Sequence, residues 1–121
     1  LPAAIGGSIA RPGLPTVAIA GDYGFQYTLP ELGVAVELGL SLPILLWDNQ
    51  KLKAIEDSMV AAQIAPNAVQ ALNPDFGALA KAYGALARQP ASLSALQDGL
   101  REAFLANVPT LIYMSPDLLE H

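Results

Sequence analysis

Short, continuously apolar segments alternate with helical patterns along this chain, and that alternation limits the folds it can adopt. Residues 16–20, 43–47 and 109–114 are apolar runs of strand length. Parallel strands buried on both faces have this solidly apolar character, because helices cover both sides of the sheet. The sequence therefore predicts an α/β fold, a three-layer sandwich with a mainly parallel sheet covered by helices on both faces.

The segments between these runs have helix signals. Thr28 and Glu31 form a capping box that predicts a helix start, and Gly39 is placed to end that helix. Either Ser92 or Ser94 is predicted to cap a helix that continues to about residue 107. The other expected elements are helices over 1–10, 53–62 and 73–83, a glycine-bracketed turn at 21–24, and weak strands at 69–72 and 85–87.

The composition excludes several function classes. Apolar residues make up 53% of the chain and charged residues 14%, and the net charge is −5, which argues against a nucleic-acid partner. The absence of cysteine excludes disulfides, thiolate metal sites and cysteine nucleophiles, and it fits a cytoplasmic protein. No apolar run is long enough to span a membrane, and we expect no membrane partner.

The two ends of the chain suggest a domain taken from a larger protein. Leu1 begins a segment that reads like the interior of a helix, and no signal peptide precedes it. Residues 119–121 resemble the start of a purification tag, so His121 is given no catalytic role. We therefore expect one domain over residues 1–118.

Polar, oxygen-bearing residues follow two of the predicted strands. Asp22 follows the first strand, and Asp48 and Asn49 follow the second. Ligands of open α/β sheets bind beyond the carboxyl ends of the strands, so Asp22 and Asn49 are expected to face one crevice. A carboxylate and an amide oxygen suit Mg²⁺, which usually takes phosphate oxygens and water as its other ligands. Gly21 and Gly24 leave backbone N–H groups accessible to phosphate.

This pattern resembles the motif of thiamine-diphosphate-dependent enzymes, which begins near Gly-Asp-Gly and ends near Asn-Asn. Flanking segments such as LPAAIGGSIA, NPDFGALAKAYG and PTLIYMSP extend the resemblance over nearly the whole chain. They resemble the C-terminal, diphosphate-binding domain of the acetolactate synthase and benzoylformate decarboxylase group. The resemblance implies thiamine diphosphate and Mg²⁺ as cofactors and a 2-keto acid decarboxylase or carboligase, acetolactate synthase-like, as the parent enzyme.

The resemblance also implies roles for particular residues. Asp22 and Asn49 would bind the metal through side-chain oxygens, and Lys51 would bind it through its backbone carbonyl. Gly21, Tyr23 and Gly24, with Asp22 and Asn49, would form the cofactor site. No catalytic residue is assigned, because the glutamate that activates the cofactor belongs to a separate pyrimidine-binding domain, usually across a subunit interface. A pyrimidine-binding domain and a homo-oligomer are thus the expected partners, and the domain alone is expected to be inactive.

Two positions differ from the family pattern. Tyr23 replaces the last glycine of Gly-Asp-Gly, where it could crowd the diphosphate, and Asp48 replaces the first asparagine. The Asp48 carboxylate would strengthen metal binding, or would repel phosphate if it pointed inward; as an isolated residue it reads as an ordinary loop residue. These differences leave open a non-catalytic structural or regulatory domain. A Rossmann-type nucleotide-binding module is the other alternative, although no G-x-G-x-x-G follows the first strand.

Overall fold

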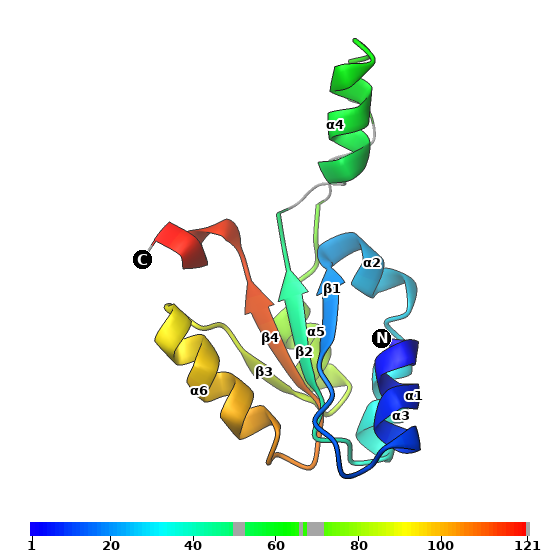
Figure 1. Cartoon of the computed structure of the whole chain (residues 1–121), viewed down its shortest axis with the longest axis vertical. Helices are drawn as coiled ribbons and strands as arrows, with labels where there is room; N and C mark the ends of the chain where they lie inside the picture. The colour runs from blue at the N-terminus through cyan, green and yellow to red at the C-terminus, as the bar shows by residue number, and fades with distance from the viewer. Residues whose placement is uncertain (50–52, 66, 68–71, 121) are drawn as a thin grey trace.

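The computed structural model describes residues 1–49, 53–65, 67 and 72–120 (Figure 1). Four parallel strands form one sheet in the order β1-β2-β4-β3. In chain order the elements are α1 (Pro2–Ala10), β1 (Ala18–Gly21), α2 (Asp22–Tyr27), α3 (Glu31–Glu37), β2 (Pro43–Trp47), α4 (Lys53–Ala61), α5 (Phe76–Ala82), β3 (Leu86–Arg88), α6 (Leu93–Ala103), β4 (Thr110–Met114) and the 3₁₀ helix η1 (Pro116–Glu120).

The strand order explains why helices lie on both faces of the sheet. From β1 to β2 the chain moves one strand along the sheet in one direction. From β3 to β4 it moves back in the opposite direction, because β4 lies between β2 and β3. Right-handed crossovers then put α2 and α3 on one face and α6 on the other. Gly99 of α6 accordingly lies beside Ile112, on the face opposite Leu111. The predicted parallel sheet with helices on both faces is confirmed.

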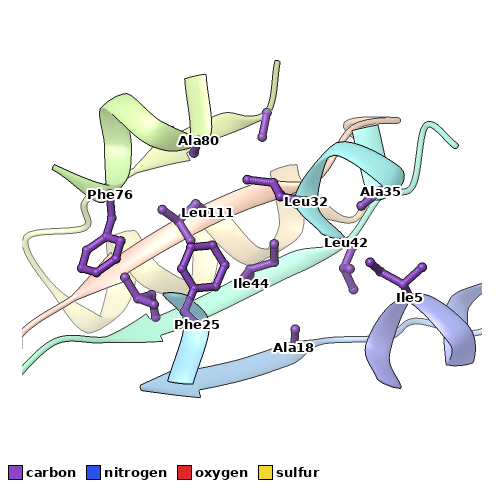
Figure 2. Packing of buried hydrophobic residues seen from close by; sticks show 12 residues of the cluster. Ile5, Ala18, Phe25, Leu32, Ala35, Leu42, Ile44, Phe76, Ala80 and Leu111 are labelled. Carbon is purple, nitrogen blue, oxygen red and sulfur yellow. The ribbon is translucent and has the colours of Figure 1, made fainter. Parts of the chain in front are cut away.

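The core lies between the sheet and the helices α1, α2, α3 and α5 (Figure 2). Ile44 and Leu111 are paired in register and fully buried on this face. Phe25 of α2 and Phe76 of α5 meet above them edge to face, with their ring centroids 6.0 Å apart. This contact joins two helices that are distant in the sequence and holds the residues before and after them at one end of the sheet.

Two predictions about local structure near β1 are wrong. Residues 21–24 do not form a turn, because α2 begins at Asp22 directly after the strand. Thr28 does not cap α3, whose N-cap is Pro30 with no side-chain cap. The backbone N–H groups of Glu31, Leu32 and Gly33 donate to carbonyls three residues back, so tight turns rather than a capping box lead into the helix.

Other local predictions are confirmed. The Oγ of Ser92 accepts a hydrogen bond from the backbone N–H of Ala95, so Ser92 rather than Ser94 caps α6. Gly39 and Gly84 follow α3 and α5 with positive φ angles, as residues that end helices often do. The weak strand expected at 69–72 falls mostly outside the described residues, and Leu72 lies in no strand.

Part of the sheet face opposite the core is open. Ile19 of β1 is 79% exposed although it lies within a strand. Its register partner Leu45 is half-buried. The third layer therefore covers β4 more completely than β1. No helix in the described part of the chain is long and apolar enough to cross a membrane.

Candidate functional site

The carboxyl ends of β1 and β2 bring two aspartates together. Gly21 pairs with Trp47 in the parallel register, so Asp22 and Asp48 are the next residues along two neighbouring strands. Both are almost fully buried, with 3% and 4% of their surfaces exposed. Buried carboxylates are costly unless they are hydrogen-bonded or bind a cation. Asp22 and Asp48 therefore need hydrogen-bond donors or a cation at this end of the sheet.

One amide connects the two carboxylates. Nδ2 of Asn73 donates to Oδ2 of Asp22 at 2.6 Å and to Oδ1 of Asp48 at 2.8 Å. Asn73 lies in the segment that leads into α5, far from both aspartates in the sequence. Three separate segments of the chain thus meet at a single side-chain NH₂ group.

Gln26 supports Asn73 from α2. Nε2 of Gln26 donates to Oδ1 of Asn73 at 3.3 Å and to the backbone carbonyl of Asp22 at 3.2 Å. The Asn73 amide consequently has hydrogen bonds on both its nitrogen and its oxygen. This fixes which way round the amide lies.

Tyr113 holds the other oxygen of Asp48. Its hydroxyl donates to Oδ2 of Asp48 at 2.7 Å, and the backbone N–H of Asp48 donates to the carbonyl of Met114 at 2.8 Å. Burial of the phenol, its hydrogen bond to Asp48 and the nearby negative charges of Asp48, Asp22 and Asp117 raise the pKa of Tyr113 to about 12. Tyr113 is therefore a protonated donor at neutral pH. Asp48 is not the ordinary loop residue that the isolated sequence suggested.

Gly21, Tyr23 and Gly24 stand beside Asp22 in the chain, at the end of β1 and in α2. Tyr23 packs its ring against Tyr27 on α2, with centroids 6.1 Å apart. A Cβ added at Gly21 or Gly24 would meet no atom within 4 Å, so the space beside their backbone is open. Asn49 directly follows Asp48 and is half-buried, whereas Lys51 lies outside the described residues.

The donor set has the chemistry of a hard cation site. Asp22 and Asp48 offer carboxylate oxygens, and Asn49 offers an amide oxygen at the end of the same strand. Oxygen ligands of this kind suit Mg²⁺ better than zinc. No group of three or more His, Cys, Asp or Glu residues that could hold a metal occurs among the described residues. A cation here would need further oxygens from a ligand or water, which is the usual situation of protein-bound Mg²⁺.

Three members of the cluster have no predicted site role. The sequence places Asn73 at the start of a helix, but the cap of that helix is Asp75, whose Oδ1 accepts from the N–H of Ala78 at 3.0 Å. Tyr113 is predicted only as a strand residue, and Gln26 has no predicted role. Their positions depend on contacts across the sheet, although Tyr113 near the carboxyl end of a strand was a usable signal.

The fold and the site define an α/β domain that presents oxygen ligands at the carboxyl ends of parallel strands. A family model described as the thiamine pyrophosphate enzyme, C-terminal TPP binding domain, matches residues 1–114. The chain therefore belongs to this family of thiamine pyrophosphate-binding domains.

Relatives with described activities support the same placement. A protein of Pseudomonas aeruginosa described as a probable 2-ketoarginine decarboxylase is 43% identical over 113 residues, covering 93% of this chain and 20% of that protein. Acetolactate synthase isozyme 2 large subunit of Escherichia coli is 32% identical over 123 residues, covering 100% of this chain and 22% of that protein. The resemblance to acetolactate synthases is confirmed, and the chain spans about a fifth of the length of these curated relatives.

The fold is shared with solved structures. The thiamine diphosphate-dependent 4-hydroxybenzoylformate decarboxylase of Rhodococcus jostii RHA1 superposes with a TM-score of 0.87 at 24% identity, covering 95% of this chain and 22% of that chain. The benzoylformate decarboxylase of Polynucleobacter necessarius gives a TM-score of 0.82 at 21% identity, covering 93% and 21%. The predicted architecture is thus the architecture of these C-terminal domains.

Proposed function

We propose that this domain binds the diphosphate of thiamine diphosphate through Mg²⁺, with Asp22 and Asn49 as side-chain ligands of the metal. Lys51 is proposed as a third ligand through its backbone carbonyl. The observation that supports this most strongly is the burial of Asp22 and Asp48 side by side at the carboxyl ends of β1 and β2. The domain itself is acidic, so a divalent cation would offset the repulsion between its carboxylates and the diphosphate.

The backbone beside Asp22 is proposed as the surface that receives the phosphates. Gly21 and Gly24 have open space where a side chain would stand. Tyr23 contributes through its backbone, because its ring packs on Tyr27. The packing of the Tyr23 ring on Tyr27 supports an arrangement in which this ring leaves the diphosphate uncrowded.

We further propose that the whole enzyme decarboxylates a 2-keto acid or joins it to a second carbonyl compound. The cofactor supplies an electron sink for the carbanion formed beside the carbonyl. This chain's residues anchor and orient the cofactor, and no catalytic residue is assigned to them. The relatives named as a decarboxylase and an acetolactate synthase support this range of activities.

We propose partners for this domain because its residues would form only the diphosphate-binding part of the cofactor site. A pyrimidine-binding domain would complete the cofactor site, and assembly as a homo-oligomer would bring that domain across a subunit interface. The absence of cysteine fits a cytoplasmic location, which we propose for the whole enzyme. The family match replaces the Rossmann-type alternative.

Calorimetric titration of thiamine diphosphate into the protein, with and without Mg²⁺, tests the proposal. We expect saturable binding that requires Mg²⁺ and is lost in Asp22→Ala. Asp98→Ala removes an exposed aspartate on α6 and serves as the matched control, with binding unchanged. Cofactor binding that persists without Mg²⁺, or that survives Asp22→Ala, would contradict the assignment.

A further inference from the structure

We propose that Asn73 is a positioning residue of the diphosphate site, bridging Asp22 and Asp48 so that one aspartate faces the metal and the other is turned away from the phosphates. This inference rests on the proposed function and deepens it. Asn73 lies outside the motif that joins Asp22 to Asn49, in the segment before α5. Its NH₂ group reaches the proposed site through the carboxylates of Asp22 and Asp48.

Asn73 leaves one oxygen of Asp22 available. Oδ2 of Asp22 accepts the 2.6 Å hydrogen bond from Asn73, and Oδ1 has no hydrogen-bond partner among the described residues. A carboxylate that binds Mg²⁺ through one oxygen is oriented by hydrogen bonds to the other. The geometry therefore assigns Oδ1 to the cation and Oδ2 to Asn73.

The same amide restrains Asp48. Asn73 takes Oδ1 at 2.8 Å and Tyr113 takes Oδ2 at 2.7 Å, so both oxygens of Asp48 accept hydrogen bonds from the protein. An unrestrained carboxylate at this position would repel an approaching diphosphate. Held by two donors, Asp48 keeps its lone pairs directed at Asn73 and Tyr113, and this accommodates an aspartate where the family pattern has asparagine.

An asparagine suits this position better than any charged residue. Its NH₂ group supplies two N–H donors to two acceptors, while its carbonyl accepts from Gln26. A lysine would neutralise charge that the cation needs, and an aspartate would place a third carboxylate in the cluster. A neutral amide orients both carboxylates and leaves the charge of Asp22 for the metal.

The backbone around Asn73 is anchored by α5. Asp75 caps the helix, and Phe76 is 2% exposed with its ring against Phe25 and Tyr113. Side chains that act by positioning need such support, since a loose donor would not fix a ligand. The packing of α5 therefore holds the backbone of Asn73 in place, and Asn73 in turn orients the two carboxylates.

The test is calorimetric titration of thiamine diphosphate with Mg²⁺ into the wild-type protein, Asn73→Ala and the matched control Gln97→Ala, an exposed amide on α6. Loss of an outer hydrogen bond to a metal ligand typically weakens metal binding about 10–100-fold. We expect a loss in that range for Asn73→Ala and none for Gln97→Ala.

A second background separates positioning from general structural support. In Asp48→Asn the amide at 48 supplies its own N–H groups, so Asn73→Ala should cost less binding there than in the wild type. Equal losses in both backgrounds, or an Asn73→Ala affinity within twofold of the wild type, would overturn the role of Asn73 while leaving the proposed function in place. A wild-type protein that binds no cofactor would overturn the proposed function and this inference with it.

Discussion

The hydroxyl of Tyr113 in β4 donates a 2.7 Å hydrogen bond to Oδ2 of Asp48, the residue that follows β2. Tyr113 lies in one of two neighbouring strands and Asp48 directly follows the other, so the bond ties the carboxyl ends of those strands together. Phe76 lies against the same tyrosine ring at a centroid distance of 6.4 Å. One side chain thus belongs to both the hydrophobic core and the polar cluster.

Replacing Tyr113 by phenylalanine should destabilise the fold without disturbing the core. The ring remains, but Oδ2 of the buried Asp48 loses its donor, which typically costs about 1–3 kcal/mol. Urea unfolding followed by circular dichroism measures the change. Tyr27→Phe, at a 75% exposed position, is the control and should change stability little. Equal effects of the two substitutions would contradict the role given to the hydroxyl.

The raised pKa of Tyr113 predicts a pH dependence at the alkaline end. The pKa is about 12 in the folded protein and about 10 in an unfolded chain, so folding favours the protonated phenol. This contribution to stability is complete below pH 10 and is lost as the pH rises from 10 to 12. The free energy of unfolding should fall more steeply over that interval in the wild type than in Tyr113→Phe. Parallel curves for the two proteins would refute the assignment.

The sequence was sufficient to predict the strands but not the cluster between their ends. The limits of β2 were predicted correctly, because a continuous apolar run begins at Pro43 and ends before Asp48. The helix that begins at Asp22 was missed, since six residues are too few to establish a helical period and two glycines suggested a turn. Asn73 meets Asp22 across 51 residues of sequence, a contact set by sheet register and by the packing of Phe76. Local patterns carry no information of that kind.

The cap of α6 gives a prediction that separates two similar serines. Ser92→Ala removes the hydrogen bond to the N–H of Ala95 and should cost about 1 kcal/mol of stability. Ser94→Ala lies inside the exposed first turn, where alanine is the better helix former, so it should be neutral or slightly stabilising. Denaturant unfolding of the two variants distinguishes them. A larger loss for Ser94→Ala would mean that the helix begins later than Leu93.

Gly84 should be the least replaceable of the helix-ending glycines. Its φ of +91° strains any other residue, and a Cβ there would lie 3.3 Å from Cγ1 of Val36 in α3. Gly84→Ala is therefore expected to lower the free energy of unfolding by more than about 1 kcal/mol. Gly13→Ala, where an added Cβ meets nothing within 4 Å, is the matched control. The idea fails if both alanines are equally tolerated in urea unfolding.

The open face of β1 predicts how this domain behaves when studied alone. Ile19 is 79% exposed on a strand at the edge of the sheet, which is the kind of apolar surface that natural proteins cover with a neighbour. We expect the domain to self-associate at high concentration, and Ile19→Lys to weaken that association. Leu105→Lys changes an 81% exposed residue beyond α6 and should leave association unchanged. Light scattering over a concentration series measures the association of both variants. A wild-type domain that remains monomeric, or equal effects of the two substitutions, would show that the domain does not associate through this face of β1.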